Sequence, residues 1–129
     1  MKEDLHTRDD VYKLVTQFYA KVRADDLLGP IFNKNIHHWP EHFEHLTDFW
    51  EGNLFFKKIF KGRPLQTHKR VDRNEGYTIK EQHFGIWLNH WVQTVNELYA
   101  GERAEMAKFK ARKIGTFFLV HMFQAKPGN

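Results

Sequence analysis

Four side chains in this sequence carry groups that can hold a metal or donate a hydrogen bond to a small ligand. They are the phenol of Tyr19, the imidazoles of His42 and His68, and the indole of Trp87. A neutral imidazole is a common metal ligand, and phenol, imidazole and indole groups can each donate a hydrogen bond. We expect one histidine to hold a metal and the other groups to face a bound molecule, although spacing alone does not show that the four meet.

Tyr19 belongs to the first predicted helix, which opens at Asp9 and Asp10, where acidic groups suit the positive end of the helix dipole. Apolar residues at intervals of three and four form one face of this helix: Val11, Leu14, Val15, Phe18, Tyr19 and Val22. A tyrosine hydroxyl on such a face needs a partner, which is either a backbone carbonyl of the core or a group in a cavity.

His42 belongs to a second predicted helix that begins near Trp39 and Pro40, because proline is tolerated in a first turn. The inward face consists of Trp39, His42, Phe43, Leu46, Phe49, Trp50 and Asn53, and it continues through Leu54, Phe55, Phe56, Ile59 and Phe60. Gly62 and Pro64 then end the pattern. His42 is therefore either a hydrogen-bonded core residue or a site residue.

Trp87 lies inside the apolar stripe of a third long helix, four residues from both His83 and Trp91. The spacing of Thr78 and Glu81 predicts a capping box at the start of this helix, and Gly101 is expected to end it. A last helix is predicted from about Glu102 to Gln124. No stretch alternates as a strand would, so the sequence predicts an all-α domain.

Two connecting segments separate these helices. Residues 27–32 are apolar, and Gly29 and Pro30 predict a turn, so we expect a loop that packs over the protein. His68 lies in residues 62–72, between two long helical patterns. By its position alone it is more often a solvated surface residue than a ligand.

Composition bounds the class of protein. The chain has 129 residues, which is enough for one domain, and 16% of them are aromatic, as in pockets for flat ligands or in a phenylalanine-rich core. It has no cysteine and no signal peptide, so we expect a cytoplasmic protein. The charges sum to +4 and are mixed along the chain, which argues against nucleic acid as a partner. No apolar run is long enough to span a membrane.

Four stretches together resemble one family, the truncated haemoglobins of the third group. They are Leu14 to Phe32, Trp39 to Trp50 with its closing Asp-Phe-Trp, Gly62-Arg-Pro-Leu followed by His68, and His83-Phe-Gly-Ile-Trp-Leu88. The resemblance covers roughly residues 9–122 and implies a truncated globin fold, a two-over-two α-helical sandwich around haem, within a single domain with short flexible tails.

The resemblance also assigns roles to the four polar residues. It implies that His68 is the proximal ligand of the haem iron. Tyr19, His42 and Trp87 then become the distal tyrosine, histidine and tryptophan, which can donate hydrogen bonds to a diatomic ligand. A distal histidine can also bind iron itself, so His42 is a second candidate ligand.

The cofactor implied is haem b, iron protoporphyrin IX. Plausible apolar contacts to the macrocycle are Phe32, Leu46, Phe49, Trp50, Leu65 and Phe84. Lys69 and Arg70 follow His68 and can reach the propionates, although a solvated surface role is equally compatible with the sequence.

Two other classes of function remain open. A non-haem metal site has its candidate ligands in one part of the chain: His37, His38, Glu41, His42, Glu44 and His45. Helical carboxylate bundles take a Glu-x-x-His pair from each of two helices, but the one such pair here is Glu3 with His6, before the first helix. A purely structural interaction module gives no reason for Tyr19, His42 and Trp87 all to lie on inward faces.

Within the haem interpretation, three distal donors argue against simple oxygen storage, because very tight binding slows release. We expect O2, NO, CO or peroxide as ligands, with redox chemistry such as nitric oxide dioxygenation or a peroxidase-like reaction. Such chemistry calls for a reductase. We expect the chain to be a monomer or a weak dimer.

Overall fold

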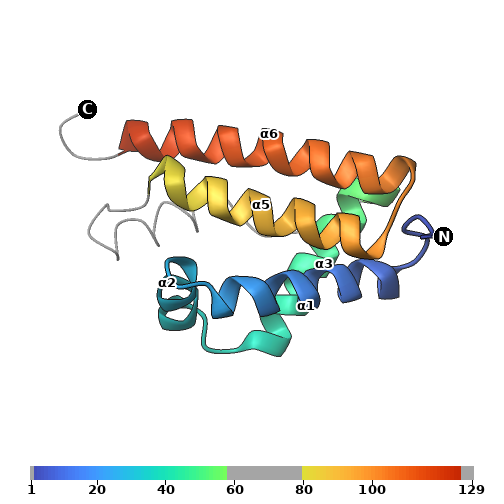
Figure 1. Ribbon diagram of the computed structural model, residues 1–129, viewed down its shortest axis with the longest axis horizontal. Helices are drawn as coiled ribbons and strands as arrows, with labels where there is room; N and C mark the ends of the chain where they lie inside the picture. The colour runs from blue at the N-terminus through green and yellow to red at the C-terminus, as the bar shows by residue number, and fades with distance from the viewer. Residues whose placement is uncertain (1, 58–79, 126–129) are drawn as a thin grey trace.

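The computed structural model describes residues 2–57 and 80–125, and these ranges contain helices and no strand. The helices are α1 (Arg8–Ala24), α2 (Leu28–Asn35), α3 (Trp39–Phe55), α5 (Glu81–Leu98) and α6 (Glu102–Ala125) (Figure 1). The all-α prediction is confirmed. The bounds predicted for the last helix agree with α6 to within one residue.

The helices form two layers around a shared core. Figure 1 shows α5 and α6 side by side and antiparallel, with α1 along the other side of α5. α1 also packs against α2 and α3, and α3 reaches α6. α1 is therefore the central element, and its apolar face meets three other helices.

The core forms where apolar residues at helical spacing meet. The six residues predicted for the buried face of the first helix are all buried in α1. Opposite them, Trp91 is 1% exposed, its ring stacks on Trp50 with 4.4 Å between centroids, and its indole N–H donates to the carbonyl of Ala107 at 3.1 Å. The small residues Ala104, Ala107 and Ala111 are buried where α6 approaches α5 and α3.

The apolar segment predicted as a loop is instead helical, and this prediction was wrong. Pro30 is the third residue of α2, where a backbone N–H has no partner within the helix, so the proline does not interrupt it. Gly29 permits a close approach between helices, because a Cβ at this position would lie 2.6 Å from the carbonyl oxygen of Arg23. The two residues that predicted a turn therefore serve the first turn of a short helix.

Two other helix ends differ from the prediction. α3 ends at Phe55, because Phe56 takes a left-handed conformation with φ of 60°. α5 begins at Glu81 with Lys80 as its N-cap, which is later than a cap at Thr78 would place it, and Thr78 itself lies outside the described residues. Nδ1 of His83 accepts the backbone N–H of Lys80 at 2.9 Å and so satisfies a group before the first turn.

The segment before α1 caps α6. The carboxylate of Asp4 accepts the backbone N–H groups of Arg103 and Ala104, each at 2.9 Å. Leu5 is fully buried. Gly101 has a φ of +141°, and its missing side chain leaves room for Asp4. The sequence predicted a short flexible tail here, and it gave no sign of these contacts with α6.

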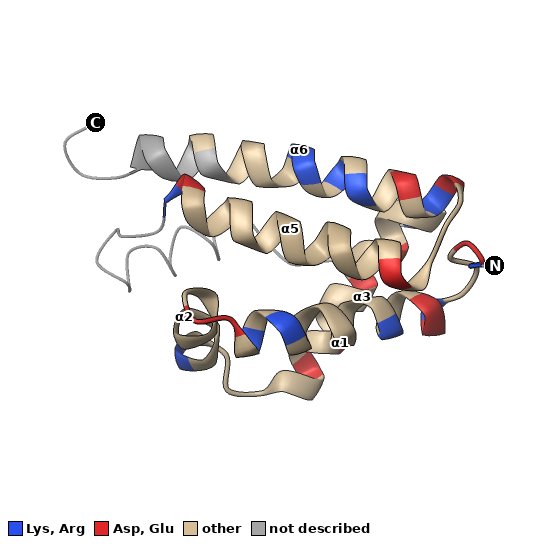
Figure 2. Ribbon diagram, viewed as in Figure 1, with Lys and Arg blue, Asp and Glu red and all other residues tan. Residues whose placement is uncertain are grey.

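Charged residues of both signs are interspersed along the described helices (Figure 2). This agrees with the mixed charge pattern of the sequence. None of the helices in the described ranges is long and apolar enough to cross a membrane.

Candidate functional site

Tyr19 and His42 meet between α1 and α3. The Tyr19 hydroxyl lies 3.3 Å from Nε2 of His42, and the two rings meet edge to face with centroids 5.2 Å apart. Sequence alone left the partner of Tyr19 open between a backbone carbonyl and a group in a site. The structure gives it an imidazole, so two of the three predicted donors lie together.

The Tyr19 phenol is neutral at physiological pH. Tyr19 is 4% exposed, and this burial raises the pKa of its phenol above the ordinary value of about 10. The group therefore keeps its proton and remains a hydrogen-bond donor. Which of Tyr19 and His42 donates in their shared bond depends on the imidazole tautomer.

Aromatic rings from α2 and from α3 itself surround this pair. The Tyr19 ring lies 5.9 Å from Phe32 of α2, 5.5 Å from Trp39 and 5.9 Å from Phe43 of α3, measured between centroids. The two polar groups thus sit against apolar, flat side chains. Aromatic surroundings with a few placed hydrogen-bond donors are typical of sites for flat, mostly apolar ligands.

Trp39 and Arg23 belong to this cluster, although the sequence did not single them out as site residues. The Arg23 guanidinium lies 4.2 Å from the centroid of the Trp39 ring, which in turn meets the His42 ring at 5.7 Å and 89°. The spacing of three residues already placed Trp39 and His42 on one face of α3. No sequence signal could find Arg23, because its contact depends on how α1 and α3 pack.

One ring, that of Phe18, separates Trp87 from this cluster. It is half-buried on α5 and meets Phe18 edge to face at 5.9 Å, and Phe18 meets Tyr19 in the same way at 4.9 Å. Among the described residues, the Trp87 indole N–H has no hydrogen-bond partner, whereas that of Trp91 is bonded within the core. The third predicted donor is thus not bonded to any other residue that the structure describes, and its role toward a ligand stays a prediction.

Comparison with known proteins decides the family. The family model of bacterial-like globins matches residues 3–122. The chain belongs to this family. The group 3 truncated hemoglobin ctb of Campylobacter jejuni is 31% identical to this globin over 122 residues, which cover 92% of each chain.

A solved structure confirms the fold. The crystal structure of the group III truncated hemoglobin from Campylobacter jejuni matches this globin with a TM-score of 0.84 and 29% identity, over 98% of both chains. The resemblance inferred from sequence motifs is therefore confirmed, and the fold is that of a truncated globin. Membership of the globin family implies haem-based binding of small ligands.

The described residues fit a haem group in their chemistry. The cluster offers a phenol, an imidazole and an unpaired indole N–H beside aromatic walls, which are the groups that suit a flat macrocycle and a diatomic ligand. The competing metal site gains no support. No three His, Cys, Asp or Glu residues within 2–57 and 80–125 form a group that can hold a metal ion. His37, His38 and His45 are exposed.

The apolar contacts predicted for the macrocycle occupy different environments in this globin. Leu46 and Phe49 are half-buried on α3, and Phe84 packs with Ile31 and Phe118 in a small cluster apart from the main core. Trp50 is 4% exposed and stacks on Trp91, so most of its surface belongs to the core.

Part of the predicted site lies outside the described residues. The proximal side falls entirely in residues 58–79, with His68 as the iron ligand, Leu65 as a ring contact, and Lys69 and Arg70 as propionate partners. These assignments stay predictions.

Proposed function

We propose that this globin binds haem b, with His68 as the proximal ligand, and carries out redox chemistry on O2, NO or peroxide rather than simple oxygen storage. The observation that carries the proposal is the approach of the Tyr19 hydroxyl to Nε2 of His42, 3.3 Å apart in an aromatic setting. Trp87 adds a half-buried indole N–H with no partner among the described residues.

Haem supplies the iron atom at which diatomic ligands bind. The chain supplies the surroundings. We propose that the macrocycle rests against the predicted apolar contacts Phe32, Leu46, Phe49, Trp50, Leu65 and Phe84, and that Lys69 and Arg70 reach its propionates. The edge contact between Phe32 and Tyr19 supports this arrangement, because it places a predicted ring contact directly beside a predicted donor.

The three donors select among ligands by charge. O2 and peroxide carry partial or full negative charge when they react, whereas CO carries less. A hydrogen bond to a charged acceptor in a dry pocket contributes about 1.5–3 kcal/mol, which corresponds to roughly 10- to 100-fold in affinity. Tyr19, His42 and Trp87 therefore retain O2 strongly and CO weakly.

Strong retention favours conversion of the ligand over its release. Nitric oxide dioxygenation joins NO and O2 to nitrate and consumes one electron, so the proposal includes a reductase as partner. A peroxidase-like reaction uses the same donors, because they can stabilise negative charge on the peroxide oxygens.

The first test is an absorption spectrum of the purified protein after addition of haem. A Soret band is expected, and its absence would overturn the haem proposal. His68→Ala should abolish the normal five-coordinate ferrous spectrum, whereas His45→Ala, which removes an exposed histidine of α3, should preserve it. A normal spectrum in His68→Ala would move the ligand assignment to another histidine.

The second test separates storage from conversion. Tyr19→Phe and Trp87→Phe should each speed O2 dissociation by roughly 10- to 100-fold and change CO dissociation less. Stopped-flow mixing of NO with the oxygenated protein should give nitrate rapidly. Slow or absent nitrate formation would refute the dioxygenase activity, and unchanged O2 dissociation would refute the donor network.

A further inference from the structure

We propose that Trp39, held in place by Arg23, is a positioning residue that keeps the His42 imidazole turned onto Tyr19 and so sets how long a ligand is retained. This inference rests on the proposed function, because ligand retention requires haem. It goes beyond that function, since neither Arg23 nor Trp39 belongs to the donor set.

The His42 ring is bounded on two sides by aromatic rings. Tyr19 meets it at 77° with centroids 5.2 Å apart, and Trp39 meets it at 89° and 5.7 Å. Trp39 also meets Tyr19 itself at 5.5 Å. The three rings thus touch pairwise, and His42 can leave Tyr19 on the indole side only if Trp39 moves.

Arg23, an exposed member of the cluster, holds the indole of Trp39 in place. It lies in the last turn of α1, four residues after Tyr19, and its guanidinium covers the Trp39 ring at 4.2 Å from the centroid, within the range of a cation–π contact. Its Nε donates to Oδ1 of Asn33 at 3.1 Å, and Nδ2 of Asn33 donates to the Arg23 carbonyl at 3.4 Å. Residues of α1 and α2 therefore hold a cation over the ring of a residue of α3.

The exposure of the side chains decreases from Arg23 through Trp39 and His42 to Tyr19. Arg23 and Asn33 are exposed, Trp39 and His42 are half-buried, and Tyr19 is buried. Trp39 is the first residue of α3, and a helix end is less constrained by its own hydrogen bonds than a helix interior. The contact of Arg23 with Trp39 therefore acts at the first residue of α3, whose position is less fixed by hydrogen bonds within the helix.

Loss of the contact between Arg23 and Trp39 should weaken the hydrogen bond between His42 and Tyr19. We expect Trp39→Leu and Arg23→Gln each to speed O2 dissociation by about 5- to 10-fold, the rate equivalent of one ordinary hydrogen bond. The matched control is Lys113→Gln, which removes another cation over an aromatic ring, 5.2 Å from the centroid of Phe109 on α6. The control should leave dissociation unchanged.

A second readout follows His42 directly. In the full chain labelled with ¹⁵N-histidine, the ring-nitrogen resonances of His42 should shift in Trp39→Leu and Arg23→Gln but not in Lys113→Gln. Unchanged resonances in both variants would overturn the proposal. Arg23→Gln changes an exposed side chain, so it remains informative even if Trp39→Leu does not fold.

A double-variant cycle separates positioning from a general structural effect. In a His42→Ala background, Trp39→Leu should cause no further acceleration, because the residue it positions is gone. Equal acceleration with and without His42 would overturn the proposal. A protein without a Soret band would instead overturn the proposed function, and the His42 resonances would still report whether Trp39 holds the imidazole.

Discussion

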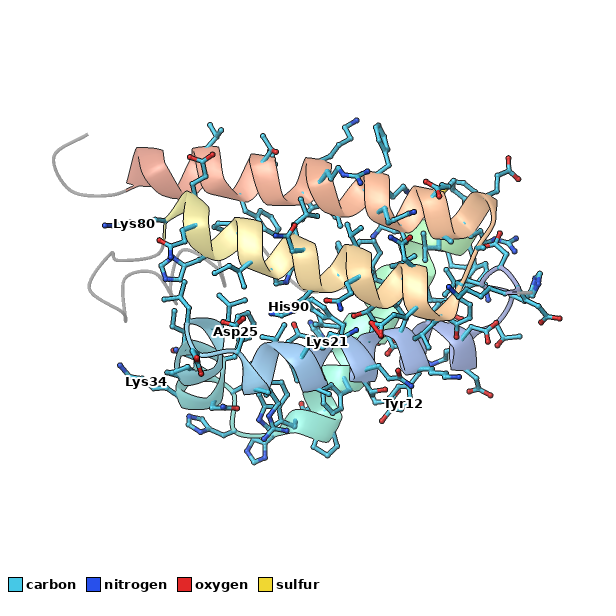
Figure 3. All side chains as sticks on the ribbon, viewed as in Figure 1. Tyr12, Lys21, Asp25, Lys34, Lys80 and His90 are labelled. Atoms are coloured by element: carbon cyan, nitrogen blue, oxygen red, sulfur yellow. The ribbon has the colours of Figure 1, made fainter. Side chains whose placement is uncertain are left out.

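Nε2 of His90 lies 2.8 Å from Oδ2 of Asp25, and this contact joins the middle of α5 to the end of α1 (Figure 3). The other carboxylate oxygen of Asp25 accepts the backbone N–H groups of Leu27 and Leu28, at 2.9 and 3.0 Å. One side chain therefore ties three helices together. It also holds the start of α2, the helix that carries Phe32 to the candidate site.

The carboxylate of Asp25 should make the stability of the protein depend on pH. The hydrogen bond from His90, followed by that from the backbone of Leu28, holds the pKa of Asp25 below its usual range, although burial opposes the shift. A depressed folded-state pKa gives stability that is present above the unfolded pKa of about 4 and is lost as pH falls through the folded-state pKa. We expect Asp25→Asn to cost about 1–2 kcal/mol at neutral pH.

Urea unfolding of the parent and Asp25→Asn at pH 7, 5 and 3 measures this effect. The difference in unfolding free energy should be largest at pH 7 and should shrink below about pH 4. Asp26→Asn is the matched control, because Asp26 is the next residue and is exposed. A difference that stays constant down to pH 3 would show that the charge of Asp25 is not what stabilises the contact.

The long helices were predictable because their apolar residues repeat at intervals of three and four. That pattern gave α1 and the start of α3, since each must bury one face against its neighbours. The helix α2 was missed because Gly29 and Pro30 usually mark a turn. Here the glycine serves tertiary packing, because only glycine fits where α2 meets the Arg23 carbonyl. The proline is tolerated because it lies in the first turn of the helix.

The site was predictable only in part. Periodicity showed that Tyr19, His42 and Trp87 could face inward, and the family motifs supplied their roles. The contact between Tyr19 and His42 depends on the angle at which α1 and α3 pack, which no local pattern encodes. Arg23 and His90 escaped notice because their partners lie far from them in sequence, in other helices.

Gly29 should not tolerate alanine. A Cβ there would lie 2.6 Å from a backbone carbonyl oxygen that cannot move aside, so we expect Gly29→Ala to destabilise the protein by about 1–3 kcal/mol. Gly85→Ala is the matched control in α5, because no atom of the described residues lies within 4 Å of a Cβ at that position. It should stabilise by up to about 1 kcal/mol through helix propensity. Thermal unfolding of both variants tests the difference in sign, and equal effects would contradict the close approach of α2 to α1.

Arg8 should stabilise the packing of α1 on α3. Its guanidinium contacts three carboxylates of α3, at 2.7 Å from Glu44, 2.6 Å from Asp48 and 3.1 Å from Glu51. Glu51 is 7% exposed, and its other cation, Lys57, is 3.7 Å away. We expect Arg8→Gln to cost about 1–3 kcal/mol, because a buried carboxylate loses its nearest charge partner.

Salt and a surface pair provide the control for Arg8. Glu105→Gln breaks a pair with Lys108 by changing a side chain that is 72% exposed, and it should cost less than about 1 kcal/mol. Unfolding free energies at low salt and at 1 M salt should show a residual cost for Arg8→Gln and almost none for Glu105→Gln. If 1 M salt removes the whole cost of Arg8→Gln, the buried carboxylate is not its cause.

The two tryptophans of α5 should separate stability from ligand chemistry. Trp91 is almost fully buried, stacks on Trp50 and bonds to the carbonyl of Ala107, so Trp91→Phe should lower stability by about 1–3 kcal/mol. Trp87 is half-buried and makes no hydrogen bond among the described residues, so Trp87→Phe should cost less than about 1.5 kcal/mol.

The rate of O2 dissociation should show the opposite order, with the larger change in Trp87→Phe. Trp87→Phe removes the third proposed donor to the ligand, and it should speed O2 dissociation by at least about tenfold. Trp91→Phe removes a donor already satisfied within the core, so O2 dissociation should stay close to that of the parent. Urea unfolding and laser-flash or stopped-flow kinetics on the same two variants make the comparison. If both variants change both quantities alike, the core and the site are one coupled unit, and the division of roles between Trp87 and Trp91 is wrong.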